Sequence, residues 1–566
     1  MMKTVAEILE EARRAPIAEA LGKVPTAELI GTLMGLFDET EKTQEALLLE
    51  IVGRCRDTEF GRRHGFAGIK SVADYRANVP LSKFEDYGEE IEKIKKGASD
   101  VLTEGKPNYM LITSGTTGDF KYLPESHENF RSKQNQFRAR FRRWQELGLF
   151  GKGATQLALS SNTPVMLKTE GGLECGSASG MSYRMMDPEV FGDEAMTASG
   201  YPSCIRGCGS AVAVDYLSMR FALENKDLTS AAGNNGGRFR LLLNVADEYQ
   251  EDIVSDIEKG TVSRKFEIDA AVRAELEAMV KANPQRAAEL RRALALGDGR
   301  FKPKYVWPNF KGMIIWISGL MAAHVEDIVP DLPDGVTFID SGYGASEIDF
   351  NFPMTPNDPF GPLCVHQAFF EFAPLCGGEP YLAHEVPDGR YHLIITSYGG
   401  LYRYDMQDIV EVRGRTGTAP NICFVSKDKD ILNLFGEHIL APHLAEIMHK
   451  TASELGHPLR QTGVWPDLAG HRYICCVEPQ KDDFPLKEFE NKIEENFLRG
   501  DLSYSYVRGE MMLLSKPAAA VQMRQGWQRE LYRRKTRPGV SEANIKLQIV
   551  MKEAPEPEWV LRGAEE

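Results

Sequence analysis

Short apolar segments that alternate with helical patterns constrain the fold of this chain most strongly. They begin at about residue 100, and several of them run into glycine or serine: YMLIT, TQLALS, FRLLLNV, GMIIWIS and VTFIDSGYG. Apolar runs of about four to eight residues are typical of buried, parallel strands. Helical patterns lie between them, at residues 215–228 and at residues 270–296 with a break at Pro284. This alternation predicts an α/β fold.

The sequence on either side of this region has different patterns. Near the N-terminus apolar residues repeat at helical spacing, which predicts mostly helices there: Leu29, Ile30, Leu33, Met34 and Phe37. From about residue 365 alternating and aromatic runs with short turns predict a β-rich subdomain: QAFFEFAPL, RYHLIITSY, IVEVRG and NICFVSK. Together these patterns predict one large domain over residues 1–426, with packed β-sheets and flanking helices.

Residues 427–566 form the second predicted domain. A helix at 441–455, a strand at 472–477 and a helix at 486–498 follow one another there, which predicts a small α+β domain. The final segment KEAPEPEWVLRG is rich in proline and glutamate, so it predicts a frayed tail.

Charge and cysteine content argue against several classes of partner. The 566 residues include 67 Lys and Arg against 82 Asp and Glu, a formal charge of −15, which disfavours nucleic acid and anionic membranes as partners. The nine cysteines are scattered, and Cys204 and Cys208 lack nearby the further ligands of a structural zinc site, which needs about four. The N-terminus has no secretory pattern, and the longest apolar run, residues 312–323, is shorter than the roughly 20 residues of a membrane span. We therefore expect a cytoplasmic protein, a monomer or weak dimer, without nucleic-acid or membrane partners.

A loop rich in hydroxyl groups and glycine follows the first apolar run. It consists of Ser114, Gly115, Thr116, Thr117 and Gly118, and Lys121 comes shortly after it. A turn of this composition presents backbone N–H and side-chain O–H donors to one point, and a nearby lysine adds positive charge. The loop lacks the Walker spacing of glycine and lysine. It predicts a phosphate-binding loop of another kind, with an ordinary polar turn as the alternative.

The segment TSGTTGDFK resembles the phosphate loop of the adenylate-forming superfamily, with Phe120 in place of a common proline. Three further segments resemble superfamily motifs and follow in the same order: GYGASE at 342–347, YRYDMQD at 402–408 and SKDKDILNLFGEHI at 426–439. Gln407 stands where glycine is usual. The superfamily contains acyl-CoA synthetases, luciferases and adenylation domains.

Within this superfamily the chain resembles the Gretchen Hagen (auxin-responsive) acyl acid amido synthetases and their bacterial relatives. The likeness rests on VWPNFKGMIIWISGLMAAHV, AFFEFAPL and ITSYGGLYRYDMQDIVEV. It implies a large adenylate-forming domain and a small mobile C-terminal domain. It also implies that ATP and Mg²⁺ are used to convert a carboxylic acid into an acyl-AMP with release of pyrophosphate. The acyl group then passes to an amino acid or another amine.

The resemblance assigns phosphate and metal contacts. Ser114 to Gly118 would hold the β- and γ-phosphates of ATP, with Lys121 beside them as a catalytic lysine. Glu347 would bind the Mg²⁺ that bridges the phosphates, since hard cations prefer oxygen ligands. A helix cap or a surface carboxylate is the alternative for Glu347.

The resemblance also assigns the nucleoside contacts. Tyr343, Gly344 and Ala345 would form a wall for adenine, and Ser346 would donate to the α-phosphate. Asp408 would accept hydrogen bonds from both ribose hydroxyls, because a carboxylate can accept two such bonds strongly. Lys427 would contact the ribose or the α-phosphate, with an exposed cation as the alternative.

For the second half-reaction, relatives swing the small domain over the site. Lys429 corresponds to the pivot, and a charged hinge residue can remain solvated in both states. Lys535, in the segment KTRP, is the candidate catalytic lysine that reaches the α-phosphate. Lys546 and an ordinary solvated basic surface are the alternatives.

The acceptor and the acyl acid stay open at this point. A ligase that transfers the acyl group to coenzyme A shares the same first step, and a non-catalytic nucleotide-binding sensor is a third hypothesis. Arg184, Lys168 and His324 are candidates to pair with the carboxylate of the acid, against the alternative of ordinary surface residues.

Overall fold

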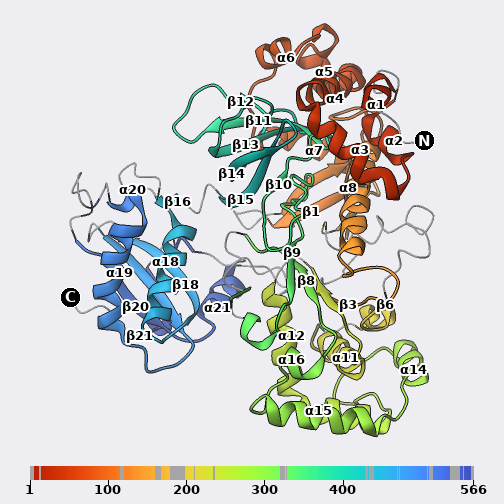
Figure 1. Cartoon of the computed structure of the whole chain (residues 1–566). Helices are drawn as coiled ribbons and strands as arrows, with labels where there is room; N and C mark the ends of the chain where they lie inside the picture. Colours follow the sequence, from red (N-terminus) through yellow and green to blue (C-terminus); the bar gives the residue numbers. More distant parts are fainter. Residues whose placement is uncertain are drawn as a thin grey trace. The chain divides into compact units, whose positions relative to one another are not determined.

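A computed structural model of the chain describes residues 5–11, 15–114, 120–159, 167–176, 178, 198–208, 211–233, 236–318, 325–326, 328–427, 431–432, 439–467, 470, 472–505, 508, 514, 516–535, 549–551 and 554–562. The chain divides into two compact units. The first comprises Met1–Met406 with Val410–Cys423, and the second comprises Gln407–Ile409 with Phe424–Glu566. Both are drawn in Figure 1.

A parallel sheet lies in the first unit. Its strands run in the order β6 (Ala198–Ser199), β3 (Thr155–Ala158), β7 (Ser230–Ala232), β8 (Gly312–Ile315) and β9 (Thr337–Asp340), with every neighbouring pair parallel. The strands predicted at TQLALS, GMIIWIS and VTFIDSGYG are thus confirmed as members of one parallel sheet. Along the neighbouring strands β3, β7, β8 and β9, α-helices lie in the chain between β3 and β7 and between β7 and β8, which is the expected α/β arrangement.

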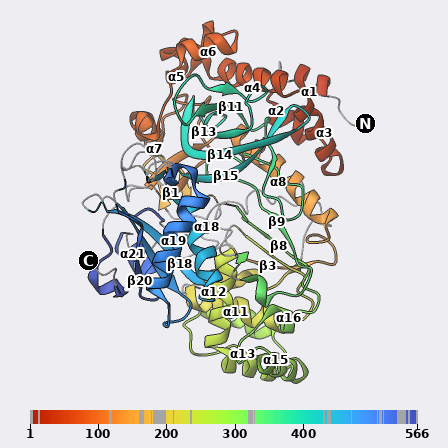
Figure 2. The same ribbon diagram turned by 60° about the vertical axis from the view of Figure 1, so that its left-hand side comes forward.

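Helices surround this sheet and share its core. They are α11 (Ala211–Glu224), α12 (Gly236–Glu248), α13 (Gln250–Lys259), α14 (Ala270–Met279), α15 (Pro284–Leu296) and α16 (Pro303–Val306). One apolar cluster includes Leu157 of β3, Tyr216 of α11 and Trp307, all fully buried. Figures 1 and 2 both show α11, α12 and α16 nearer to β3 and β8 than α15 is.

The predicted strand FRLLLNV is wrong. These residues lie in α12, where Phe239, Leu242, Leu243 and Ala246 are buried. Their spacing forms one helical stripe rather than a strand, and a short apolar run does not distinguish the two by composition alone.

The strand predicted at YMLIT belongs to a second sheet. β1 (Tyr109–Ser114) pairs antiparallel with β2 (Phe120–Glu125) and parallel with β5 (Glu174–Gly176), and β4 (Leu167–Lys168) completes the sheet. The long helix α8 (His127–Glu146) follows β2 directly, and the Ser126 side chain caps it by accepting from Asn129 N–H. Phe141 and Trp144 of α8 pack with Ile314 and Ile339 of the parallel sheet. α8 therefore connects the first sheet to the second.

The predicted β-rich subdomain is confirmed as a third sheet. Its strands run in the order β10 (Gly361–Pro362), β15 (Ala419–Lys427), β14 (Tyr404–Thr416), β13 (Gly389–Ser397), β11 (Ala368–Pro374) and β12 (Tyr381–Leu382). N-terminal helices flank it, including α3 (Thr26–Asp38), α4 (Thr40–Arg54), α6 (Val72–Asn78) and α7 (Gly88–Lys95). Gln44 of α4 joins the sheet by donating to the carbonyls of Val365 and Ala368.

The second unit has the predicted α+β character. Its sheet runs β18 (Leu459–Asp467), β19 (Arg472–Pro479), β20 (Ala519–Met523) and β21 (Val560–Arg562), with helices α18 (Ala441–Glu454), α19 (Leu486–Gly500) and α21 (Trp527–Lys535). The predicted frayed tail is wrong. β21 pairs with β20, and Trp559 packs in a core with Met523 and Trp527 at 2% exposure. Burial of this large apolar side chain outweighs the preference of the proline-rich run for solvent.

In the part of the chain that the structure describes, no helix has both the length and the apolar content to cross a membrane. In the described part of the chain, none of the nine cysteines forms a disulfide.

Candidate active site

The strands on either side of the phosphate-type loop are paired. Ser114 ends β1 opposite Phe120, and Lys121 on β2 lies opposite Thr113. The loop residues Gly115, Thr116, Thr117 and Gly118 lie outside the described residues. The Lys121 ammonium is half-buried and lies 5.0 Å from the centroid of the Phe84 ring, a cation–π contact. The hairpin therefore holds Ser114 and Lys121 at the two ends of one loop.

The GYGASE segment follows the end of β9. Gly342 has a φ of +90°, and a Cβ at this position would lie 2.4 Å from Arg140 Nη2, so the site requires glycine. Its N–H donates to Asp340 Oδ1 (2.8 Å), and its carbonyl accepts from Trp316 Nε1 (2.7 Å). These contacts fix the point where the chain leaves the sheet.

Asp340 ties this segment to β8. Its Oδ2 accepts from Ile317 N–H at 2.9 Å, which joins the segment after β8 to the segment after β9. Burial raises the pKa of the Asp340 carboxyl to about 6, and the two N–H donors oppose that shift only in part. The carboxyl ends of two neighbouring parallel strands are thus joined, at the edge where α/β folds bind ligands.

Tyr343 packs beneath the turn that follows. Its ring stacks on Phe350 at 4.1 Å between centroids and 12° between planes. Its N–H donates to the Asn351 side chain at 2.7 Å. Tyr343 is 8% exposed, so its ring is a packed wall rather than a free surface side chain.

Residues 344–349 form a tight turn that presents Ser346 and Glu347. Gly344 pairs with Asp349, and Ala345 N–H donates to the Ile348 carbonyl at 3.0 Å. Ile348 is fully buried and anchors the turn, whereas Ser346 and Glu347 are partly exposed. Glu347 precedes no helix in the described part of the chain, so the helix-cap alternative is wrong.

Helix α8 contacts the backbone of this turn. Lys133 Nζ donates to the Ser346 carbonyl at 2.7 Å, and Asn129 Nδ2 donates to the Glu347 carbonyl at 3.1 Å. Arg140 Nη1 donates to Asp349 at 2.7 Å. Because α8 begins directly after β2, the helix links the Lys121 hairpin to the turn that carries Glu347.

Asp408 and Lys427 are paired within the second unit. Asp408, on β14, is 1% exposed, and its Oδ1 accepts from Nζ of Lys427, the last residue of β15. Lys427, for which an exposed cation was the alternative, is 33% exposed at its side chain and is paired with this carboxylate. A buried carboxylate with a cation beside it can accept further hydrogen bonds without remaining an uncompensated charge.

Gln407 adopts a left-handed backbone conformation, which suits the glycine that is usual at this position of the motif. Its φ is +53°, in the left-handed region. Gln407 lies within β14, and a side chain in this left-handed conformation costs about 1–2 kcal/mol. The carboxylate of Asp408 keeps its place in the motif.

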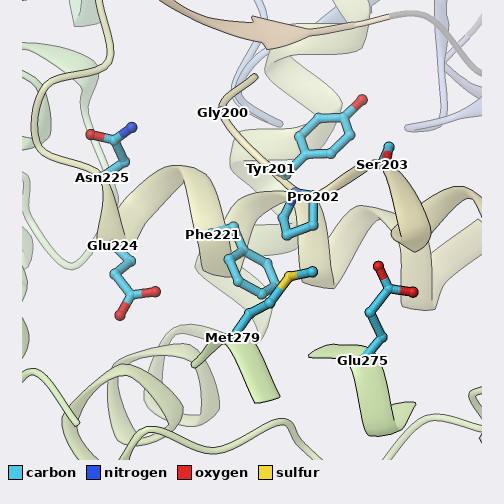
Figure 3. Close-up of a pocket in the computed structure, with 9 residues that line it drawn as sticks. All are labelled: Gly200, Tyr201, Pro202, Ser203, Phe221, Glu224, Asn225, Glu275 and Met279. Carbon is cyan, nitrogen blue, oxygen red and sulfur yellow. The ribbon is translucent and has the colours of Figure 1, made fainter. Parts of the chain in front are cut away.

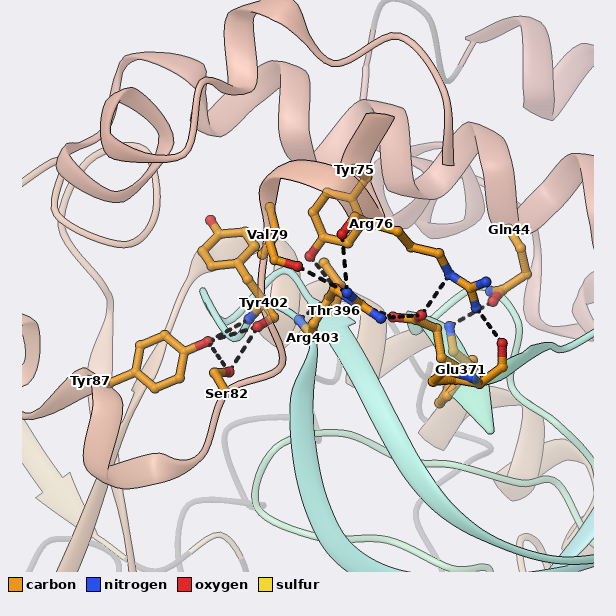
Figure 4. Close-up of polar contacts among 12 residues, drawn as sticks. Gln44, Tyr75, Arg76, Val79, Ser82, Tyr87, Glu371, Thr396, Tyr402 and Arg403 are labelled. Carbon is orange, nitrogen blue, oxygen red and sulfur yellow. Dashed lines mark hydrogen bonds and ion pairs between the residues drawn. The ribbon is translucent and has the colours of Figure 1, made fainter. Parts of the chain in front are cut away.

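A buried ion network beside this motif was not predicted (Figure 4). Arg403 donates from Nε and Nη2 to the two carboxylate oxygens of Glu371 at 2.9 and 3.0 Å, and Arg76 Nε donates to Glu371 at 2.8 Å. Glu371 is 1% exposed. In the sequence, this network is indicated only by the acidic residue inside the apolar run AFFEF.

Tyr402, next to Arg403, is fixed by hydrogen bonds to its backbone. Its carbonyl accepts from Ser82 Oγ at 2.9 Å and from Tyr87 OH at 3.0 Å. Figure 4 shows these contacts at the other end of the same network. Residues distant in sequence therefore immobilise the start of the YRYDMQD segment.

Most of the remaining predicted residues lie outside the described part of the chain. Lys429, Lys546, Arg184 and His324 lie outside the described residues, and Lys535 ends α21 with a side chain that is likewise outside the description. Lys168 is exposed on β4 and lies 3.7 Å from Glu174, as expected for an ordinary surface residue.

A cavity of about 520 Å³ opens between α11, α14 and residues 200–203 (Figure 3). Tyr201, Phe221 and Met279 contribute apolar surface to it, and Glu224 and Glu275 contribute carboxylates. None of the predicted site residues lines this cavity.

Comparison with known families identifies the chain. The model described as the GH3 family N-terminal domain matches residues 30–334, and the model of the GH3 family central domain matches residues 361–427. The chain belongs to the GH3 family. The predicted family is thus confirmed, and its first domain alone accounts for more than half of this GH3 protein.

Two relatives of this GH3 protein are amido synthetases from plants. It is 25% identical over 435 residues to a probable indole-3-acetic acid-amido synthetase, GH3.1, of Arabidopsis thaliana, covering 73% of this chain and 71% of the relative. It is 26% identical over 446 residues to the indole-3-acetic acid-amido synthetase GH3.8 of Oryza sativa subsp. indica, covering 75% and 72%.

Solved structures confirm the predicted fold class of this GH3 protein. The GH3.15 acyl acid amido synthetase matches with a TM-score of 0.77 at 19% identity, over 92% of this chain and 93% of the other. A 2-hydroxyisobutyryl-CoA ligase in the postadenylation state matches with a TM-score of 0.52 at 12% identity, over 94% and 92%. At these identities the likeness concerns the fold alone.

Proposed function

We propose that this GH3 protein is an acyl acid amido synthetase. A carboxylate oxygen of the acid attacks the α-phosphorus of ATP and expels pyrophosphate, which gives an acyl-AMP. The nitrogen of an amino acid or other amine then attacks the acyl carbon, loses a proton and expels AMP. Family and fold confirm the predicted enzyme class, an ATP-dependent ligase that forms an adenylate. The observation that carries the proposal is the match of the GH3 family to both the N-terminal and the central domain.

The first step needs charge neutralisation and alignment more than covalent catalysis. We assign the β- and γ-phosphates to the loop from Ser114 to Gly118 with Lys121, and the α-phosphate to Ser346. The Glu347 carboxylate suits Mg²⁺, because this cation takes one or two carboxylates together with phosphate oxygens and water. Mg²⁺ bound there would neutralise phosphate charge. The partly exposed turn that carries Glu347 supports this role.

We assign the nucleoside to Tyr343, Gly344, Ala345 and Asp408. The stacked ring of Tyr343 supplies a rigid apolar wall for adenine. The Asp408 carboxylate accepts both ribose hydroxyls, and Lys427 balances its charge before ATP binds. Lys427 can then turn toward the ribose or the α-phosphate, since its side chain is 33% exposed.

The second step requires the C-terminal domain. We assign the pivot to Lys429 and the catalytic contact with the α-phosphate to Lys535, by resemblance to the family alone. We also propose that the protein acts in the cytoplasm, as a monomer or weak dimer.

The choice of acceptor distinguishes this function from that of a coenzyme A ligase. The purified protein is incubated with ATP, Mg²⁺ and an accepted acid, and with amino acids, hydroxylamine or coenzyme A in parallel reactions. Mass spectrometry of the products is expected to show amides with amino acids. A thioester formed faster than any amide would replace the proposal with the ligase alternative.

A further inference from the structure

Two donors on α8 hold the backbone of the turn that carries Ser346 and Glu347. Lys133 Nζ donates to the Ser346 carbonyl at 2.7 Å, and Asn129 Nδ2 donates to the Glu347 carbonyl at 3.1 Å. The two donors lie one helical turn apart on the same face of the helix. They contact the two consecutive residues to which the proposed function assigns the α-phosphate and Mg²⁺.

One buried carboxylate orients both donors. Glu125 Oε2 accepts from Lys133 Nζ at 2.7 Å, and Asn129 Nδ2 lies 3.2 and 3.3 Å from the two oxygens of the same carboxylate. Glu125 is 1% exposed and the Lys133 side chain is 5% exposed. A charge pair so deeply buried keeps its geometry only when its remaining hydrogen bonds are made, and the two backbone carbonyls accept part of them.

Glu125 connects this cluster of side chains to the hairpin that carries Lys121. Glu125 ends β2, the strand that leaves the phosphate-type loop and carries Lys121. Ser126, the next residue, caps α8 and fixes where the helix begins. A rigid path of hydrogen bonds and helix therefore runs from the Lys121 hairpin to the turn of Ser346 and Glu347.

We propose that Lys133 and Asn129, oriented by Glu125, are positioning residues that set the place of Glu347 for Mg²⁺ and of Ser346 for the α-phosphate. The inference rests on the proposed function. The proposed function assigns neither residue a contact with ATP. Their effect passes through the backbone of the turn, so it concerns the Mg²⁺-dependent part of ATP binding more than the part that needs no metal.

The test measures ATP affinity of the full-length protein by calorimetry, with MgCl₂ and with EDTA. The ratio of the two dissociation constants reports the Mg²⁺-dependent gain. In Lys133→Met we expect this ratio to fall about tenfold or more, which corresponds to about 1.4 kcal/mol, while the affinity in EDTA changes less than about threefold.

Arg138→Met is the matched control. Arg138 is also buried on α8, but it donates to Val24 and Leu21 carbonyls of the N-terminal region rather than to the turn. It is expected to lower stability while it leaves the Mg²⁺-dependent ratio unchanged. Equal losses of the ratio in both variants would overturn the proposal, because they would reflect general destabilisation.

A second variant keeps the proposal testable if Lys133→Met does not fold. Asn129→Ala removes the contact with the Glu347 carbonyl and no charge, so we expect it to fold and to reduce the ratio about three- to tenfold. An unchanged ratio in this variant overturns the proposal, and so does a wild-type protein that shows no Mg²⁺-dependent gain. Failure of the proposed function is recognised separately, as ATP binding without formation of any acyl-AMP.

Discussion

Lys427 Nζ donates to the Asp408 carboxylate, so a cation lies beside a buried anion. The ammonium contacts Oδ1 of a side chain that is 2% exposed, whereas the lysine side chain itself is 33% exposed. Asp408 is therefore a buried, paired acceptor, and Lys427 is the more exposed partner of the two.

Removing the carboxylate should weaken ATP binding. Asp408→Ala deletes the acceptor for both ribose hydroxyls, and hydrogen bonds to a charged group contribute about 1.5–3 kcal/mol. We expect the dissociation constant for ATP to rise about 10- to 100-fold, measured by calorimetry, with a melting transition that remains cooperative. Unchanged affinity would show that Asp408 has no ribose contact.

The left-handed backbone at Gln407 predicts that this position tolerates glycine better than valine. Gln407→Gly should keep ATP affinity, because glycine adopts the observed φ of +53° without strain. Gln407→Val should have a free energy of unfolding at least about 1–2 kcal/mol lower than that of Gln407→Gly, because a left-handed conformation costs about that much for a residue with a Cβ. Urea unfolding of the two variants compares these effects. A valine variant as stable as the glycine variant would show that the strain is not real.

Removing the Glu371 carboxylate from its buried network should destabilise the first unit. Glu371→Gln leaves Arg76 and Arg403 without their shared carboxylate, and breaking a buried ion pair costs about 3–5 kcal/mol. Glu411→Gln is the control, since that carboxylate is 33% exposed and pairs with Arg390 at 3.0 Å on the surface. Its loss should cost about 1 kcal/mol or less by urea unfolding. Equal losses would contradict the importance of burial.

Stability should depend on pH through Glu50. Burial raises the pKa of its carboxyl to about 7, despite hydrogen bonds from Ile17 N–H and Tyr398 OH. A raised folded-state pKa favours the protonated form. The contribution of that form is complete below about pH 4.5, the unfolded value, and is lost as pH rises through about 7. Relative to Glu50→Gln, the wild type should lose on the order of 1–3 kcal/mol between pH 5 and pH 8. Parallel pH profiles of the two proteins would rule this out.

Sequence patterns predicted the elements that local periodicity determines. β8 and β9 follow from apolar runs that end near glycine or serine, and α18 and α19 follow from helical stripes. The run FRLLLNV was assigned wrongly, because its burial as one face of α12 depends on how that helix packs. Trp559 was assigned to a frayed tail, because only the finished sheet offers it a core.

The order of the motifs predicted the candidate site residues, but it did not predict the contacts that fix their positions. Glu347 and Asp408 were identified from short segments whose chemistry is local. The contact between Lys133 and the Ser346 carbonyl joins residues 213 positions apart, so no spacing in the sequence reveals it. Glu125 and Glu371 act as buried carboxylates, and their burial arises only when separate segments pack together.

The most direct test of the central claim is exchange of labelled pyrophosphate into ATP across a library of carboxylic acids. If this GH3 protein activates an acid as its acyl-AMP, exchange requires that acid and Mg²⁺, and Glu347→Gln lowers it strongly. Tight ATP binding without exchange, over the whole library, would contradict the account and favour a nucleotide-binding sensor.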